Sequence, residues 1–245
     1  MKGSFIKKIF LSFITSMFVF PFVTLSAFSF SGPTHVFVTK NAINMLDGSD
    51  KKIGEFYTSN DRTILAESCT KPDDDEIEGA YKYHFFNPAT EKNFMGEDLS
   101  ALVKFTSHYN NAVELFSCGK RVDSMVELAR ALHFLEDLNT PVHTNNQDVL
   151  DTAFNFPFHI SFEDKCVEIQ DETKSLLSPL STESLKYYID NKNSAIGKAC
   201  AYTANDNLYS LVKDLLPKDT VCKNAIVNAV EASEGVLYKF YLDVN

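Results

Sequence analysis

The segment that most constrains the fold runs from residue 131 to 146 and reads ALHFLEDLNTPVHTNN. His133 and Asp137 lie four positions apart, which places both side chains on one face of an α-helix. The residues around His133 are apolar, so this helix is expected to enter a protein core. Pro141 ends the helix, and His143 follows it. Because buried polar groups need partners, the segment predicts a core helix that carries ligands.

The same spacing recurs at His159 and Glu163, which are also surrounded by apolar residues. An imidazole and a carboxylate on one helical face both offer lone pairs from a rigid support, so each pair can grip a metal ion. A single pair of this kind is typical of a His–acid interaction on a solvated face. Two pairs in apolar surroundings, together with His143, favour metal binding. His108 has no acidic partner at helical spacing and is expected to be a surface or packing residue.

Helical periodicity dominates the rest of the 245 residues, and alternating strand patterns are scarce. The length and the 44% hydrophobic content suit one sizeable globular domain. The first predicted helix is capped by Thr34 and ended by Asp47-Gly48. Short helical pieces at Ile53–Tyr57 and Asp61–Ser68 follow, and then an acidic loop at TKPDDDE. The remaining predicted helices are Leu99–Phe116, Arg121–Leu138, one that begins near Pro157, and a last one at Val221–Leu242. The sequence therefore predicts one all-α domain.

The first residues are typical of a secretory signal peptide, predicted at residues 1–29, which leaves a domain at 30–245. Three lysines precede an apolar run from Ile9 to Val23, and small residues follow it. An uncleaved membrane anchor is the alternative, because no Asp, Glu, Lys or Arg occurs between Ile9 and Thr39. Pro21 and the small residues favour cleavage. No later segment has the length and apolarity of a membrane span, so a secreted or periplasmic protein is expected.

The predicted mature chain is strongly acidic. Removing residues 1–29 takes away three lysines and leaves 20 basic against 33 acidic residues, a net charge of −13. Such a surface does not attract polyanions, which counts against a nucleic-acid partner. In an exported chain, up to two disulfides and one spare thiol are expected among five cysteines of undetermined pairing: Cys69, Cys118, Cys166, Cys200 and Cys222. They form no C-x-x-C pair and are not interpreted as zinc ligands.

Five segments together resemble the bacterial zinc-dependent phospholipases C: GPTHVFVTKNAINML, KPDDDE, HFFNP, ALHFLEDLNTPVHTNN and FHISFEDKCVEI. They occur in the same order and at similar spacing as in the small single-domain enzymes and in the catalytic domain of clostridial alpha-toxin. The resemblance runs from about Phe30 to the last residue. It implies an all-α domain of the phospholipase C and P1 nuclease type, built around three zinc ions.

Carried over residue by residue, the resemblance implies three metal positions. Position A would be held by Asp73, His84, His133 and Asp137, and position B by His143, His159 and Glu163. Position C would be held by His35, by Asp137 as a bridge, and by the α-amino and carbonyl groups of the first mature residue. Asp73 is chosen because the family's ligand directly follows a proline, but Asp74 and Asp75 stay open.

The activity that the resemblance implies is hydrolysis of a glycerophospholipid, such as phosphatidylcholine, to diacylglycerol and a phosphorylated head group at a membrane surface. Asp73 would also orient or deprotonate the attacking water. Tyr81 stands where the family places an aromatic that helps hold choline, and an aromatic face favours a quaternary ammonium. A packing role for Tyr81 is the alternative. Asp74 replaces the tyrosine of the choline-preferring small enzymes, so the choice of head group stays open. A monomer is expected.

Two other functions compete. An S1/P1-type nuclease acting on single-stranded nucleic acid shares the fold and the three-zinc scheme. That group usually has aspartate as the last ligand and a longer interval before it, whereas here the ligand is Glu163 and His143 lies sixteen positions before His159. A non-catalytic zinc-binding helical protein is the other. Structural zinc sites are closed by four protein ligands, and position B has only three.

The resemblance also predicts where the mature chain begins. Related enzymes start at a tryptophan whose α-amino and carbonyl groups bind zinc, but this chain has no tryptophan. In the S1/P1 relatives the first residue lies five positions before the first histidine ligand, which corresponds to Phe30 and His35. Ala27 and Ser29 are small residues at the positions that signal peptidase reads, which supports the same cut. Cleavage after Ala27, giving Phe28, is the alternative.

Overall fold

In the computed structural model of the chain, the described residues are 30–49, 51–75, 80–144, 149–212 and 218–245. Within these ranges the chain forms α-helices and short 3₁₀ helices and no β-strand, which confirms the predicted all-α class. The predicted signal peptide at 1–29 and the alternative start at Phe28 lie outside the described residues. No helix of the described part has the length and apolarity needed to cross a membrane.

The α-helices are α2 (Gly32–Ser49), α3 (Lys51–Phe56), α4 (Ser59–Ser68), α5 (Lys71–Asp75), α6 (Ala101–Ser117), α7 (Arg121–Leu138), α8 (Val149–Thr173), α9 (Thr182–Asp190), α10 (Asn193–Val212) and α11 (Asp219–Val244). Three short 3₁₀ helices connect some of them: η1 (Ala80–His84), η2 (Pro141–His143) and η3 (Lys174–Leu176).

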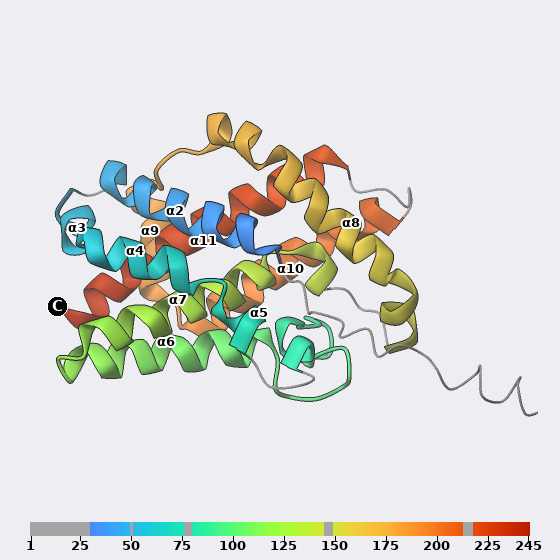
Figure 1. Cartoon of the computed structure of the whole chain (residues 1–245), viewed down its shortest axis with the longest axis horizontal. Helices are drawn as coiled ribbons and strands as arrows, with labels where there is room; N and C mark the ends of the chain where they lie inside the picture. Colours follow the sequence, from blue (N-terminus) through green and yellow to red (C-terminus); the bar gives the residue numbers. More distant parts are fainter. Residues whose placement is uncertain (1–29, 50, 76–79, 145–148, 213–217) are drawn as a thin grey trace, which may run out of the picture.

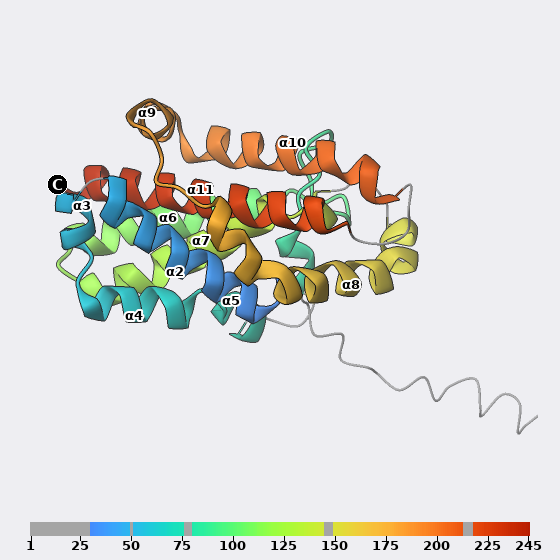
Figure 2. The same ribbon diagram turned by 90° about the horizontal axis from the view of Figure 1, so that it is seen from above.

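Helix α7 is the central element of the fold. It packs lengthwise against α6 and also contacts α2, α4, α10 and α11 (Figure 1). Figure 2 shows α11 between α10 on one side and α2 on the other. Every residue from Ala131 to Thr144 is buried, so the second half of α7 and the turn after it lie in the core. The helix therefore carries its polar side chains to the centre of the molecule.

Asp61 connects the start of α4 to the start of α7. In a capping box, Thr58 Oγ1 accepts from the Asp61 N–H at 3.2 Å, and Asp61 Oδ2 accepts from the Thr58 N–H at 2.8 Å. The same oxygen accepts from Arg121 Nη2 at 2.8 Å. Burial by itself would raise the pKa of Asp61, but the hydrogen bonds from Arg121 and Thr58 lower it. This contact fixes α4, whose end leads into α5, relative to α7.

Several sequence predictions of elements were wrong. Thr34 lies inside α2 rather than capping it, because the helix begins at Gly32 and Pro33 suits a first turn. Helix α8 begins at Val149, and Pro157 lies within it, although a proline usually marks a first turn. The acidic segment that was predicted as a loop forms α5 over Lys71–Asp75. Helices α9 and α10 were not predicted at all.

The expected disulfides are absent from the described structure, where the five cysteines are free thiols. Cys166 on α8 and Cys222 on α11 are nevertheless neighbours in the core. Burial, followed by a hydrogen bond with the Cys222 side chain, raises the pKa of the Cys166 thiol well above its usual value.

Candidate metal centre

Six separate elements bring the predicted ligands together. The contributions are His35 from α2, Asp73 from α5, His84 from the end of η1, His133 and Asp137 from α7, His143 from the end of η2, and His159 and Glu163 from α8. All of these residues are buried except Asp73, whose side chain keeps 15% of its exposure. Residues far apart in the sequence therefore converge in one buried region.

The four residues predicted for position A lie together. His84 Nδ1 is 2.9 Å from Asp137 Oδ2 and 3.0 Å from His133 Nε2. Asp73 Oδ1 lies 3.5 Å from His133 Nε2 and 3.8 Å from His84 Nδ1. Single ligand atoms of His84, His133 and Asp137 all lie within 4.8 Å of one another, as a shared metal ion requires. Asp74, one of the alternatives to Asp73, is exposed to solvent.

The three residues predicted for position B form a second compact group. His159 Nε2 lies 2.7 Å from Glu163 Oε1 and 3.1 Å from His143 Nε2. The spacing of His159 and Glu163 by one helical turn on α8 produces the first contact, and η2 supplies His143. Their ligand atoms also lie within 4.8 Å of one another.

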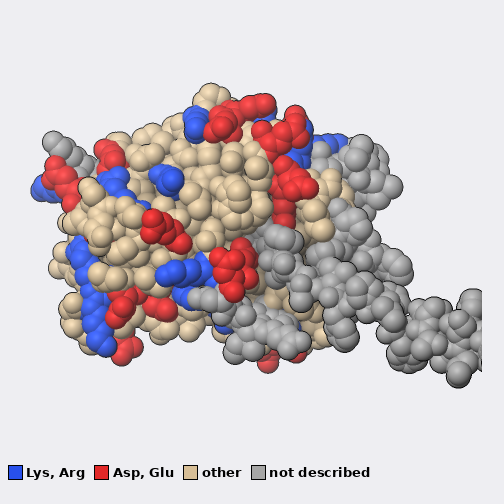
Figure 3. All heavy atoms as spheres, viewed as in Figure 1, with Lys and Arg blue, Asp and Glu red and all other residues tan. Residues whose placement is uncertain are grey.

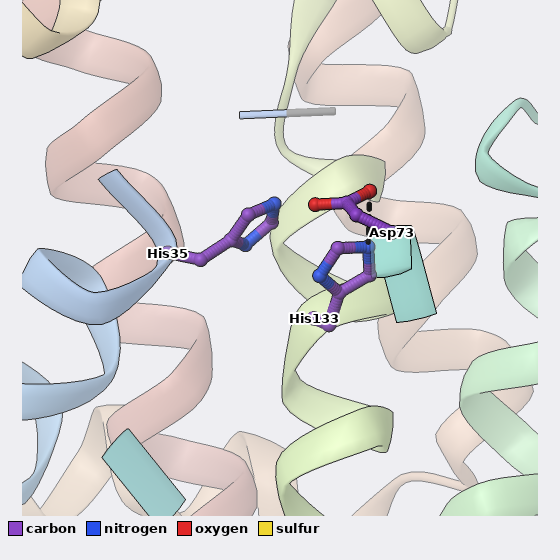
Figure 4. A group of neighbouring side chains, drawn as sticks. All are labelled: His35, Asp73 and His133. Atoms are coloured by element: carbon purple, nitrogen blue, oxygen red, sulfur yellow. Dashed lines mark ion pairs between the residues drawn. The ribbon is translucent and has the colours of Figure 1, made fainter. Parts of the chain in front are cut away.

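His35, predicted for position C, lies against the position A residues. Its ring stacks on that of His133 with centroids 4.1 Å apart, and its Nε2 is 3.8 Å from Asp137 Oδ1. Figure 4 shows His35, Asp73 and His133 approaching from three helices, and their ligand atoms also lie within 4.8 Å of one another. Phe30 is fully buried, with its ring edge-on to His35 at 5.8 Å.

Asp137 is the side chain that the positions share. Its Oδ2 faces His84 and His133, whereas its Oδ1 lies 3.2 Å from His143 Nδ1 and 3.8 Å from His35 Nε2. One carboxylate therefore faces the residues of all three positions.

Several buried polar atoms in this region have no hydrogen-bond partner among the described residues: Asp73 Oδ1, Asp137 Oδ1, His143 Nδ1 and Glu163 Oε1. Imidazole nitrogens lie 3.2 Å from Asp137 Oδ1 and 2.7 Å from Glu163 Oε1. Buried polar groups rarely go unsatisfied, and four in one cluster indicate a missing partner. Carboxylate oxygens and neutral imidazole nitrogens form the donor set that Zn²⁺ prefers, so the residues fit the metal.

Burial without a metal shifts the acids of the site in different directions. Desolvation raises the pKa of Asp73 well above its usual value and that of Glu163 to about 8. Burial would also raise the pKa of Asp137, but the neighbouring His133 and His143 hold it well below its usual value. Asp137 is therefore the charged acid at the centre of the group.

Two histidines have partners that sequence reasoning missed. His133 Nδ1 lies 2.7 Å from the carbonyl oxygen of Cys69, and His35 Nδ1 lies 2.5 Å from Glu136 Oε2. The carbonyl contact depends on the backbone path and leaves no signal in the sequence. Glu136 did leave one, since it is a second acid inside the apolar stretch LHFLEDL.

Tyr81 and His108 lie outside the cluster. Tyr81 is 42% exposed and stacks on Phe94. Phe94 in turn packs edge-on against Phe85, whose ring centroid lies 4.8 Å from that of His143. A series of aromatic rings thus connects the surface to position B. His108 pairs with Glu127 of α7 at 2.8 Å and stacks on the ring of Phe134.

Comparison with known proteins gives sequence relatives of one kind. No model of a known protein family matches the chain. The phospholipases C of Clostridium perfringens and Paraclostridium bifermentans are 23% and 25% identical over 241 residues, which cover 86% of this chain and 59% of each relative. The phospholipase C of Clostridium novyi is 24% identical, over all of this chain and 68% of its own length. The chain thus spans about three-fifths of the first two relatives.

Solved structures show the same fold. The alpha-toxin from Clostridium absonum matches with a TM-score of 0.72 and 24% identity, over 86% of this chain and 64% of the toxin. The alpha-toxin from an avian strain of Clostridium perfringens matches with a TM-score of 0.74 and 21% identity, over 86% of this chain and 63% of the toxin. The all-α arrangement of the described residues is therefore that of the alpha-toxins.

Proposed function

Because the chain belongs to the bacterial phospholipase C family, we propose that it is a zinc-dependent phosphodiesterase. Its substrate would be a glycerophospholipid of the phosphatidylcholine type, which it would hydrolyse to diacylglycerol and a phosphorylated head group. The observation that carries the proposal is the convergence of three His–carboxylate groups on one buried region. The resemblance of the ligand segments supports three zinc ions, at positions A, B and C.

The charges of the ligand set suit a phosphodiester anion. Asp73, Asp137 and Glu163 bring three negative charges, against six positive charges from three zinc ions, and metal-binding histidines are neutral. A net charge of about +3 would then face the substrate. This positive charge would stabilise the negative charge that develops on the phosphoryl oxygens in the transition state. Bound zinc would also lower the pKa of water toward about 7, which supplies a nucleophile at neutral pH.

The protein's own residues would have distinct tasks. Asp137 faces all three groups and would hold their spacing. Asp73 is the partly exposed acid of position A, and its carboxylate would orient the attacking water and accept its proton. Position B has three protein ligands, which would leave one coordination site for water or substrate. The exposed Tyr81 ring would receive a cationic head group.

The proposal includes export and processing. Removal of residues 1–29 would leave Phe30 first, and its α-amino and carbonyl groups would complete position C. The burial of Phe30 beside His35 supports this role. The protein would then be secreted or periplasmic and act on a membrane surface as a monomer.

An S1/P1-type nuclease is the competing function with the same metals. Binding of nucleic acid requires a positive surface that neutralises phosphates. On the face in Figure 3, basic and acidic side chains are interspersed, apart from a narrow row of basic side chains near the left edge. Together with the overall excess of acidic residues, this favours a lipid substrate.

The test combines a metal count with a substrate panel. Purified mature protein should contain three zinc ions per chain by plasma mass spectrometry. It should also release phosphocholine from phosphatidylcholine vesicles and leave single-stranded DNA intact. Preferential cleavage of DNA would identify a nuclease instead. Bound zinc without activity on either substrate would identify a non-catalytic zinc protein.

A further inference from the structure

Glu136 is a buried acid that the proposed reaction does not use. Its side chain is fully buried between α7, α2 and α11. Oε2 lies 2.5 Å from His35 Nδ1, and Oε1 accepts hydrogen bonds from Thr39 Oγ1 at 3.1 Å and from Ser233 Oγ at 3.4 Å. Both carboxylate oxygens therefore have partners, and the two hydroxyls hold the group in one orientation.

The contact with Glu136 decides which nitrogen of His35 can bind a metal. A neutral imidazole donates from one ring nitrogen and offers a lone pair from the other. Burial by itself raises the pKa of Glu136 well above its usual value, but a cation on Nε2 of His35 would favour the ionised carboxylate. An ionised carboxylate oxygen can only accept, so the proton of His35 then belongs on Nδ1. The lone pair is then on Nε2, the nitrogen that faces Asp137 Oδ1.

We propose that Glu136 is a positioning residue for metal position C, which fixes the proton of His35 on Nδ1 and presents Nε2 to the ion. A carboxylate behind a ligating imidazole also makes the ligand more basic and strengthens its bond to zinc. Glu136 would in addition bring a fourth negative charge close to the three ions, without occupying a coordination site.

His133 shows that this chain uses the same device twice with different acceptors. The His133 Nδ1 contact is with the neutral carbonyl of Cys69, which orients the ring without adding charge. His35 is the only side-chain ligand proposed for position C alone, since Asp137 is shared. An ionised Glu136 behind His35 would therefore compensate for the small number of protein ligands at that position.

The proposal rests on the metal centre proposed above, but not on the identity of the substrate, and its test measures metal and protons rather than turnover. Glu136→Leu removes the acceptor. Glu136→Gln keeps an acceptor oxygen for His35, and its amide can donate to the two hydroxyls, but the charge is lost. We expect the third zinc ion to bind about 10–100-fold more weakly in the leucine variant and less than about tenfold more weakly in the glutamine variant.

The second readout is the position of the His35 proton in metal-free protein, at a pH high enough to ionise Glu136, whose pKa burial raises. It is obtained from long-range proton–nitrogen NMR spectra of the imidazoles. Wild type and Glu136→Gln should carry it on Nδ1, and Glu136→Leu should show a mixture of tautomers. If the leucine variant does not fold, Thr39→Val replaces it. Loss of that hydroxyl leaves Oε1 with the longer hydrogen bond from Ser233, and we expect the third zinc ion to bind severalfold more weakly.

Glu234 provides a matched control. It is also a fully buried glutamate, it accepts from the Ser49 hydroxyl and the Leu180 N–H, and it lies outside the metal centre. Glu234→Gln should lower stability without changing zinc affinity. Unchanged affinity for the third ion in the Glu136 and Thr39 variants would overturn the role of Glu136, whereas a wild-type protein with only two zinc sites would reject position C itself.

Discussion

Removing the metal should leave a protein whose stability falls as the pH rises from 6.5 to 8. The cause is Glu163, whose pKa burial raises from an ordinary 4.5 to about 8. Between these values the folded metal-free protein keeps a proton that the unfolded chain has released. Raising the pH therefore favours the unfolded state. Asp73, whose pKa is also raised, acts in the same direction.

His35 and His133 do not cancel this effect in that pH window. Burial lowers the pKa of His35 from 6.5 to about 3 and also lowers that of His133. Their contribution to stability rises with pH, but only up to the unfolded value of 6.5. Above pH 6.5 these two rings are neutral in both the folded and the unfolded protein. The raised pKa values of Glu163 and Asp73 then determine how stability changes with pH.

The size of the effect follows from the linkage relation. Each group contributes about 1.4 kcal/mol per pH unit, so Glu163 alone lowers the free energy of unfolding by about 2 kcal/mol between pH 6.5 and 8. For a domain of this size, that corresponds to a fall in Tm of about 4–8 °C. The stabilisation by bound zinc has the opposite pH dependence. Zinc replaces the protons on these carboxyl groups, so it binds more tightly as the pH rises.

The assay is thermal unfolding followed by circular dichroism, with excess zinc or with a chelator, at half-unit pH steps from 6.5 to 8. The gap between the two Tm values should widen with pH. Glu163→Gln is always neutral, so its metal-free form should show a smaller fall and be more stable than metal-free wild type at pH 8. A metal-free wild-type Tm that stays level across the window, or an equal fall in the glutamine variant, would refute the reasoning.

Three further outcomes are expected. Asp137→Ala should reduce zinc content by more than one ion and abolish turnover, because the side chain faces all three positions. In the same metal count and lipid assay, His108→Ala should keep zinc content and turnover near wild type. In oxidised protein, Cys166 and Cys222 should be the pair that forms a disulfide, and peptide mapping by mass spectrometry that finds either one joined elsewhere would contradict the proximity argument. N-terminal sequencing of secreted protein should give Phe30 as the first residue. Cytosolic protein with one extra residue before Phe30 should bind two zinc ions rather than three. Binding of three zinc ions by the extended chain would exclude the α-amino group as a ligand.

The ligand pairs were predictable because helical spacing fixes which side chains share a face. His133 with Asp137, and His159 with Glu163, needed only the four-residue interval and an apolar environment. The bounds of α7 also matched the prediction, since Pro141 provides a clear stop. These features depend on local geometry alone.

Features that depend on packing were not predictable in the same way. Helix α10 carries small and polar residues in the stretch NSAIGKACAYTAND, so its apolar periodicity is weak, and its place is set by α6, α7 and α11. The grouping of His35 with Asp73 requires α2 and α5 to meet at α7. No spacing in the sequence contains that information. The resemblance to a known family placed both residues in one metal centre, but at different positions, Asp73 at A and His35 at C.

The adjacent acids of α7 explain how one helix serves the whole centre. Consecutive helical residues point about 100° apart, so Asp137 faces the ligands of η1 and η2 while Glu136 faces α2 and α11. Both are buried, and the residues from Ala131 to Thr144 around them are buried as well. A displacement of α7 would therefore disturb the shared ligand, the support of His35 and the core packing at the same time. Because these contacts are made by one rigid element, metal loading and the packing of the core are coupled.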